Sequence, residues 1–173
     1  MSVRHSLLAL LDREPTHGYA LKAAFEAGTA HTWPLNVGQV YTTLARLERD
    51  GLASPAENAD GQRQTWRITR EGRAELVRWF QAAVVEAPPA RDELAIKVLL
   101  AIAAQTEDVT AILDCQRAAT MERLQDLTRQ KARADPEHEL GWLLLLDALV
   151  LKAEAELRWL DLCAARLAAR GAR

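Results

Sequence analysis

The chain has few cysteines and no long hydrophobic run, and both shortages exclude classes of protein. Cys115 and Cys163 are the only cysteines in 173 residues and do not form the CxxC spacing of thiolate metal sites, so neither such a site nor a disulfide framework is expected. The longest apolar run, residues 142–151, is too short to cross a membrane. The N-terminus lacks a full secretory pattern, so we expect a cytoplasmic protein with no membrane partner.

The sequence also lacks the clusters of side chains that carry out catalysis or hold a metal. Its four histidines are not spaced like the ligands of a metal site. They are His5, His17, His31 and His138. The acidic pairs at 92–93 and 107–108 stand at predicted helix starts, where the helix dipole accounts for them. No glycine-rich phosphate loop and no glycine-flanked nucleophilic serine occurs. We therefore expect no enzyme, no metal site and no cofactor.

The net charge of −2 gives no general affinity for nucleic acid, but the charges are unevenly distributed. Between residues 63 and 78 the chain carries five arginines against two acids. These arginines are Arg63, Arg67, Arg70, Arg73 and Arg78. A local basic strip on a neutral protein is expected where only one surface meets phosphates.

Residues 36–52 (NVGQVYTTLARLERDGL) predict an amphipathic helix whose outer face suits DNA. Val40, Leu44 and Leu47 recur at helical spacing and form an apolar stripe. The opposite side is small, uncharged or basic and carries no acid, and it consists of Gly38, Gln39, Thr42, Ala45, Arg46 and Arg49. A helix that enters a major groove needs such a slim face, with donors for base edges and phosphates. Gly51 can close the helix in the left-handed conformation.

The segments around this helix predict a winged helix-turn-helix domain over residues 1–87. Helices are expected over residues 4–12 and 17–28, and then a turn at Trp33-Pro34. An extended piece at 52–55, turn formers and an alternating stretch at 63–68 predict a two-stranded β wing. Thr69 can cap a further helix over 70–85. The second helix is expected to offer four side chains to the core, namely Tyr19, Leu21, Ala24 and Phe25.

Beyond Pro88-Pro89, residues 90–173 predict an all-α dimerisation domain, which makes the whole chain mainly α. Helices are expected after caps at Asp92 and Thr106, and from Pro136 to about residue 169. In the last helix, residues 142–151 (WLLLLDALVL) are apolar nearly all the way round, and a chain of this size has little interior to bury them. A homodimer through the C-terminal helices is the expected solution. The alternative is that the chain's own three-helix bundle covers this surface.

In three stretches the chain resembles the PadR family of bacterial transcriptional regulators. The family's first two helices are similar to SLLALL at 6–11 and HGYAL at 17–21. Its recognition helix is similar to Trp33-Pro34 followed by VGQVYTTLARLERDGL at 37–52. RQTWRITREGR at 63–73 is similar to its wing. The C-terminal half looks like the branch of the family with an extended helical dimerisation domain. The chain departs from many relatives at Thr42, where they carry proline.

The resemblance implies a dimeric regulator, usually a repressor and sometimes an activator, that binds double-stranded DNA at a pseudo-palindromic operator. Some members release DNA on binding a small, often aromatic, molecule, so a small aromatic effector is an expected partner. The candidate DNA-binding residues are Asn36, Gln39, Tyr41, Thr42, Thr43, Arg46, Arg63 and Arg67. Among them Gln39 suits adenine, Arg46 suits guanine and Thr42 suits a thymine methyl group. The alternative for this face is an ordinary solvated helix surface.

Three of these candidates carry alternatives of their own. Tyr41 could reach a phosphate, as the resemblance implies, or pack against Phe25 or Trp33. Arg63, near the hairpin tip, is expected to contact a phosphate or the minor groove. Arg67 could do the same, pair with Glu71 or remain solvated.

A second function stays open, namely a small-molecule-binding sensor in which DNA binding is weak or lost. The neutral net charge and the five tryptophans motivate it, because tryptophan in a dimer-interface pocket could stack on an aromatic effector. Packing is the expected role of Trp66, Trp79 and Trp142.

Overall fold

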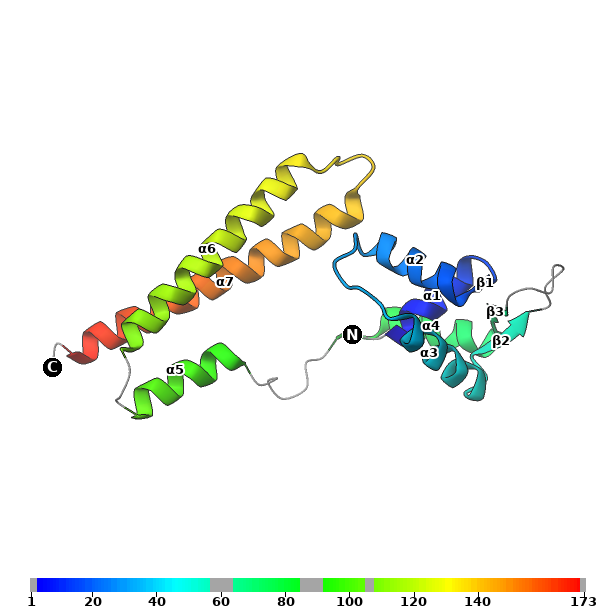
Figure 1. Ribbon diagram of the computed structural model, residues 1–173, viewed down its shortest axis with the longest axis horizontal. Coiled ribbons are helices and arrows are strands. Elements are labelled where there is room, and N and C mark those ends of the chain that lie inside the picture. The colour runs from blue at the N-terminus through cyan, green and yellow to red at the C-terminus, as the bar shows by residue number, and fades with distance from the viewer. Residues whose placement is uncertain (1–2, 57–63, 85–91, 105–107, 172–173) are drawn as a thin grey trace. The chain divides into compact units, whose positions relative to one another are not determined.

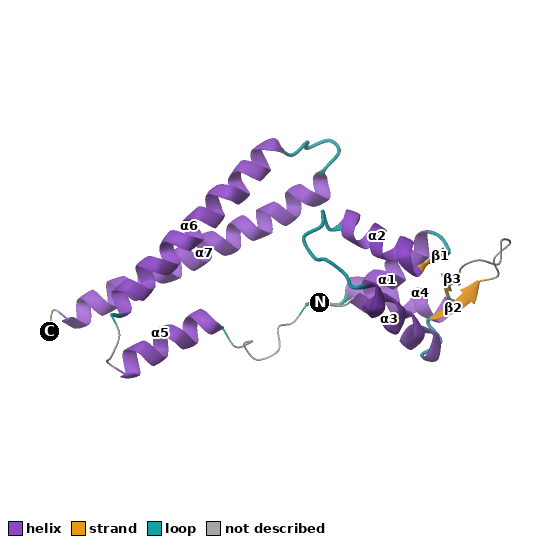
Figure 2. Cartoon of the chain, in the orientation of Figure 1, coloured by secondary structure: helices purple, strands orange, loops and turns teal. Residues whose placement is uncertain are grey.

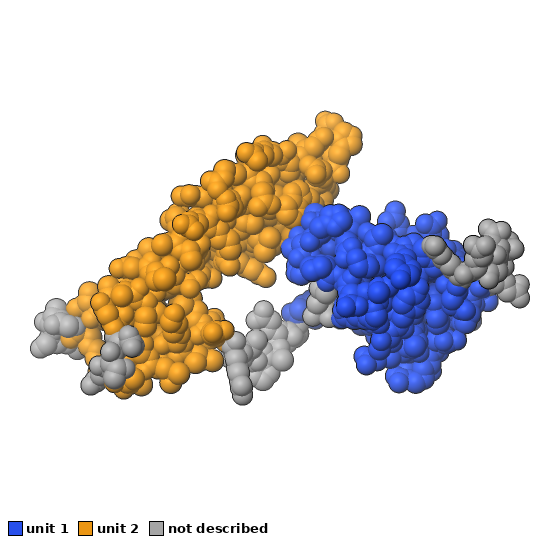
Figure 3. All heavy atoms as spheres, in the orientation of Figure 1, with its two compact units in different colours: residues 1–85 blue, residues 86–173 orange. Residues whose placement is uncertain are grey.

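The computed structural model describes residues 3–56, 64–84, 92–104 and 108–171 of the chain. The chain divides into two compact units, Met1–Val85 and Glu86–Arg173 (Figure 3). The expected boundary at 88–89 lies outside the described residues. Helices dominate both units, and the small sheet lies in the first unit (Figure 2). The expected mainly α fold with a winged helix-turn-helix is confirmed.

The first unit is a winged helix with one more strand than the sequence predicts (Figure 1). Its elements are α1 (Val3–Arg13), β1 (Thr16–His17), α2 (Gly18–Gly28), α3 (Val37–Arg49), β2 (Ala53–Ala56), β3 (Thr65–Ile68) and α4 (Arg70–Gln81). The antiparallel sheet has the order β1-β3-β2. β1 has two residues, which is too short for an alternating pattern to reveal. Pro55 fits in β2 because this strand lies at the edge of the sheet.

The core of the first unit is built where α1, α2, α3 and the inner face of β3 meet. Its most buried large side chains are Leu7, Leu8, Leu11, Leu21, Val40, Leu44 and Leu47. Trp66 and Ile68 of β3 are buried, as the alternation predicts, while Arg67 between them is exposed. Two expectations for α2 are wrong, because Tyr19 is 59% exposed and Ala24 is exposed. Ala24 instead lines a pocket between α1 and α2.

The junction between α3, the wing and α4 is tightly packed. Gly51 has a φ of +70°, and the N–H of Leu52 donates to the carbonyl of Leu47, which closes α3 as the sequence predicts. The Thr69 hydroxyl accepts from the N–H of Gly72 at 3.0 Å, so Thr69 caps α4 as expected. A Cβ built on Gly72 would lie 2.1 Å from the Leu52 carbonyl oxygen, so only glycine fits here. α4 ends at Gln81, earlier than the expected residue 85.

The second unit consists of α5 (Glu93–Ala104), α6 (Val109–Arg133) and α7 (Leu140–Gly171). α6 and α7 pack along each other, and α5 packs on α6 (Figure 1). Asp92 caps α5 as expected, since its carboxylate accepts from the N–H of Ala95 at 3.0 Å. Asp108 caps α6, whereas the expected cap, Thr106, lies outside the described residues. Within the described part of the chain, no helix combines the length and the apolar character needed to span a bilayer.

The start of the last helix differs from the prediction. Residues 136–138 form a turn, and α7 begins at Leu140 rather than at Pro136. The Asp135 carboxylate accepts from the N–H of Glu137 at 2.9 Å, and the Glu139 carboxylate accepts from the N–H of Asp135 at 2.7 Å. These side chains satisfy the backbone in the turn, so the helix starts after it.

One polar cluster interrupts the apolar contact between α6 and α7. Glu156 accepts hydrogen bonds from the buried Thr120 hydroxyl and from the Gln116 amide, the latter at 2.8 Å, and it lies 3.4 Å from Arg123. Burial raises the pKa of the Glu156 carboxyl, but these hydrogen bonds and the arginine outweigh burial and hold the pKa below its usual value. A satisfied polar group at this depth favours one register of the two helices over the others.

Candidate nucleic-acid interface

The outer face of α3 is exposed, and it comprises Gly38, Gln39, Thr42, Ala45, Arg46 and Arg49. The opposite stripe, Val40, Leu44 and Leu47, has no exposed surface, so the predicted division of the helix into two faces is confirmed. Glu48 is also exposed, but helical periodicity places it on the flank of Tyr41. The outer face itself therefore carries no acid.

The hydrogen bonds of α3 leave its long polar side chains available. The Thr42 and Thr43 hydroxyls donate to backbone carbonyls one turn back, at 2.8 and 2.7 Å. Each threonine side chain can still accept a hydrogen bond through its hydroxyl oxygen and present its methyl group. Thr43 is half-buried. Among the residues that the structure describes, Gln39 and Arg46 have no side-chain hydrogen-bond or ion-pair partner. Both are therefore available to a ligand without breaking a bond within the protein.

The start of α3 is fixed by its cap and by the loop before it. The exposed Asn36 accepts from the N–H of Gly38 at 2.7 Å, which commits its side-chain oxygen to the helix cap. In the preceding loop, the Glu26 carboxylate accepts from the Leu35 N–H at 3.1 Å and from the Lys22 ammonium at 2.7 Å. The Lys22 bond first, and the Leu35 bond second, hold the pKa of Glu26 below its usual value. The buried Leu35 anchors the loop to the core.

The end of α3 carries a chain of charges that sequence periodicity could not reveal. The Asp50 carboxylate accepts from Nε and Nη2 of Arg49 at 3.2 Å and lies 3.0 Å from Arg4 of α1. Arg4, Gln39, Thr42 and Arg46 line one side-chain groove that runs beside the outer face. Asp50 partly neutralises Arg49 and leaves Arg46 as the arginine of this face without an acidic partner in the described chain.

The Tyr41 ring packs against residues other than Phe25 and Trp33, the two that the sequence suggests. Its ring packs over Gly18 at the start of α2, and its centroid is 6.2 Å from that of Tyr19 at an interplanar angle of 74°. The ring contact that the structure gives Tyr41 is thus with Tyr19, in place of the packing against Phe25 or Trp33 that the sequence suggests as one alternative. Tyr41 keeps 39% of its surface exposed at the flank of α3.

The wing presents one of its two predicted arginines in the described chain. Nε of Arg67 donates to the Ser54 hydroxyl at 3.2 Å across the β2–β3 pair, and it does not pair with Glu71. Arg63 lies outside the described residues. In α4, Nε of Arg73 donates to the Asp12 carboxylate of α1 at 2.8 Å, so this arginine joins two helices. The basic strip of the sequence is thus partly used inside the unit.

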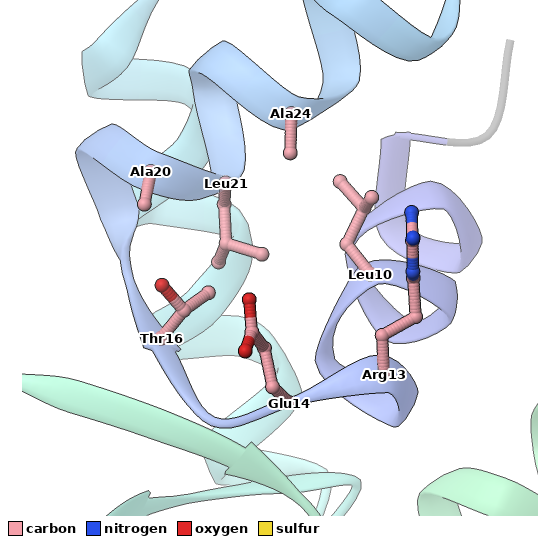
Figure 4. Close-up of a pocket in the computed structure, with 7 residues that line it drawn as sticks. All are labelled: Leu10, Arg13, Glu14, Thr16, Ala20, Leu21 and Ala24. Carbon is pink, nitrogen blue, oxygen red and sulfur yellow. The ribbon is translucent and has the colours of Figure 1, made fainter.

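A pocket between α1 and α2 offers another concave surface, but it is not built for an aromatic ligand (Figure 4). It is lined by Leu10, Arg13, Glu14, Thr16, Ala20, Leu21 and Ala24. The Glu14 and Arg13 side chains stand on two sides of it, and no aromatic side chain lines it. Trp66 and Trp79 pack on the core of the first unit, and Trp142 is half-buried. The described residues contain no group of acids, histidines and cysteines that could hold a metal.

Comparison with known proteins shows which protein families the two parts of the chain match. The Transcriptional regulator PadR-like family matches residues 7–78, and the Virulence activator alpha C-term family matches residues 90–168. The probable transcriptional regulator Rv1176c of Mycobacterium tuberculosis is 26% identical over 182 residues, covering 93% of this chain and 95% of that protein.

Two solved structures of Bacillus subtilis PadR share the fold at 19% sequence identity. The complex with operator DNA has a TM-score of 0.68 and covers 95% of this chain and 97% of that chain. The complex with p-coumaric acid has a TM-score of 0.72 and covers 96% and 98%. At this identity the likeness shows the fold alone. The chain therefore carries a domain of the Transcriptional regulator PadR-like family over residues 7–78, followed by a Virulence activator alpha C-term domain over residues 90–168.

Proposed function

We propose that this regulator is a homodimeric repressor whose two α3 helices enter the major groove at the half-sites of a pseudo-palindromic operator. The observation that carries the proposal is the outer face of α3, which is exposed, free of acids and furnished with unpartnered Gln39 and Arg46 side chains. Bacillus subtilis PadR, which shares the fold, is known in complex with operator DNA. A two-fold protein is expected to bind a two-fold operator.

Each candidate residue then has a role that its surroundings allow. Gln39 and Arg46 read base edges, and Thr42 offers its methyl group to a thymine because its hydroxyl proton is committed to the helix. At the edge of the contact, Asn36 offers its amide N–H groups as donors, because its oxygen is committed to the helix cap. Thr43 offers an acceptor, because its hydroxyl proton is committed to the backbone. The wing arginines 63 and 67 contact the phosphate backbone.

The surface of the second unit supports dimerisation. Seven large apolar side chains on α5 and α7 are 41–64% exposed, and they are Ile96, Leu99, Leu100, Leu140, Leu144, Leu151 and Leu162. The described residues of these helices therefore leave apolar side chains exposed on the second unit. Exposed apolar side chains on two helices are typical of an interface. A second copy of residues 90–173 is the partner that we propose for it.

A substitution on the outer face tests DNA binding against a matched control. Thr42→Glu places a carboxylate where phosphates and base acceptors would approach, and like charges brought together cost several kcal/mol. Thr128→Glu is the control, because Thr128 on α6 is exposed and its hydroxyl also donates one turn back, to Leu124, at 2.8 Å. The probe is DNA recovered by the unsubstituted protein from a random pool, and binding is read by gel shift.

Three outcomes separate the proposal from its alternatives. Loss of binding with Thr42→Glu, with Thr128→Glu unchanged and both variants folded, supports it. Equal binding by both variants overturns the assignment of the outer face. No binding by the unsubstituted protein at low salt overturns DNA binding and favours the sensor function.

A small aromatic effector is the second part of the proposal. It rests on the solved complex of Bacillus subtilis PadR with p-coumaric acid. We expect p-coumaric acid or a related planar phenol to quench the tryptophan fluorescence of this chain and to release the selected DNA. Quenching without any DNA binding would instead indicate a sensor. Unchanged fluorescence and unchanged DNA affinity across a panel of such phenols would refute the effector.

A further inference from the structure

The two tyrosines of the chain lie together, although they belong to different helices. The sequence contains only Tyr19 and Tyr41. Tyr19 is in the first turn of α2 and Tyr41 in the second turn of α3. Their rings meet edge to face, with centroids 6.2 Å apart, which is a favoured geometry for an aromatic pair. The pairing joins the two helices at the end of the unit where α2 begins.

Gly18 provides the space for this pair. A Cβ on Gly18 would lie 2.7 Å from Cζ of Tyr41, 2.9 Å from its Cε1 and 3.1 Å from its hydroxyl oxygen. Gly18 is buried, and it is not among the residues with a positive φ. Glycine is therefore needed here for room rather than for backbone conformation. The missing side chain lets the Tyr41 ring lie directly on the start of α2.

Both tyrosines keep exposed surface in spite of this packing. Tyr19 is 59% exposed and Tyr41 is 39% exposed. Neither hydroxyl has a hydrogen-bond partner in the part of the chain that the structure describes. A large ring that could have been buried is instead held at the surface with its donor free. Such a side chain suits a ligand that combines an apolar edge with a hydrogen-bond acceptor.

The charges around the pair favour an anionic ligand. The first turns of α2 and α3 carry no acid, and the N-terminus of α2 contributes the positive end of its dipole. The acid on the Tyr41 flank of α3 is Glu48, seven residues or about 10 Å further along the helix. Tyr41 also directly precedes Thr42 of the outer face. The occupant that this placement favours is the phosphate backbone of the same DNA that α3 binds.

We propose that Tyr19 and Tyr41 together bind the DNA backbone beside each half-site, and that Gly18 is the positioning residue of the pair. The inference rests on the proposed function, because it needs α3 to bind DNA. It adds Tyr19, a residue on the helix before α3, to the contact. It also assigns the glycine to steric support of Tyr41. Phenol hydroxyls donate to phosphate without carrying charge, so they position the protein without releasing extra counterions.

Fluorine NMR of the full-length protein tests the contact directly, because 3-fluorotyrosine labelling gives signals from two tyrosines only. Tyr19→Phe assigns them. Both signals should shift when DNA recovered from a random pool is added. A shift of the Tyr41 signal alone would overturn the role of Tyr19. A Tyr19 shift that follows protein concentration without DNA would indicate a protein contact instead and would also overturn it.

Affinity measurements give the second readout. Tyr19→Phe should weaken binding about 5-fold or more, since two hydrogen bonds are lost per dimer. The slope of log affinity against log salt should stay unchanged, which separates a neutral hydroxyl from an arginine. Wild-type affinity of Tyr19→Phe would overturn the contact. If the unsubstituted protein binds no DNA, both this inference and the proposed function fail. If it binds DNA but the Tyr19 signal does not shift and Tyr19→Phe does not change the affinity, the inference alone fails.

A double-mutant cycle tests the role of Gly18. Gly18→Ala should weaken DNA binding while Tyr41 is present, because the new methyl group displaces the ring. In a Tyr41→Ala background the same substitution should have no further effect. Equal losses in the two backgrounds would show that Gly18 acts independently of Tyr41 and would overturn the positioning role.

Discussion

Replacing Arg46 with alanine should weaken DNA binding and also reduce its sensitivity to salt. Arg46 is exposed on the outer face and has no acidic partner in the described chain, so its whole charge is available to DNA. Each phosphate neutralised contributes about 0.9 to the slope of log affinity against log salt. A dimer carries two copies of Arg46, so the slope should fall by about 1.8 if both meet phosphates.

The alternative contact for Arg46 predicts a different pattern. If it forms two hydrogen bonds to a guanine, each copy contributes about 1–3 kcal/mol of discrimination. The variant would then lose its preference for guanine at one position in each half-site. Selection from random DNA with the variant distinguishes this outcome from a uniform loss over all sequences.

Arg49→Ala is the matched control. It removes the same charge from the same helix, but Asp50 already accepts from the Arg49 guanidinium. Binding of the two variants is compared by fluorescence anisotropy between 50 and 200 mM salt, about the range over which phosphate contacts are resolved. The Arg46 variant should show the larger change in slope or in specificity. If Arg46→Ala leaves both unchanged while Arg49→Ala alters them, the reasoning about the outer face is refuted.

Three further variants test packing, assembly and titration. Gly72→Ala should lower the thermal midpoint markedly, because its Cβ would lie 2.1 Å from the Leu52 carbonyl oxygen, and an unchanged midpoint would contradict this. Leu144→Ser with Leu151→Ser, at positions 61% and 63% exposed, should produce folded monomers in analytical ultracentrifugation; retained dimers would place the interface elsewhere. Glu156 has a lowered pKa, so its charge stabilises the fold above about pH 4.3 and this stability is lost as pH falls through the folded pKa. Acid unfolding followed by circular dichroism should therefore be less steep in Glu156→Gln, and identical curves would refute this.

The features that the sequence predicts well are those written in local patterns. The buried stripe of α3 follows from its 3.6-residue period, and the Thr69 cap and the Gly51 ending follow from side chains next to the backbone they satisfy. The buried face of β3 follows from alternation. Each of these needs only neighbours within about one or two helical turns, so the single sequence contains the information.

The features that the sequence misses depend on contacts between distant segments. The sequence suggests Tyr19 as a core residue, but Tyr19 is 59% exposed and its ring meets the Tyr41 ring of the next helix. The bond from Arg67 to Ser54 depends on the register of the wing, which the sequence alone leaves open. The Arg4–Asp50 contact joins two helices 46 residues apart in the chain. No periodicity indicates such pairs, and only the folded arrangement reveals them.

The central claim is that the outer face of α3 lies in a major groove twice per dimer. Methylation protection tests it most directly, because the reagent attacks guanine N7, which lies in the major groove. With DNA recovered from a random pool, the account predicts two separate sets of protected guanines related by the operator dyad, one helical turn or a multiple of it apart. Protection should disappear with Thr42→Glu. A bound complex with no protected guanine N7, or with one continuous set, would contradict the account.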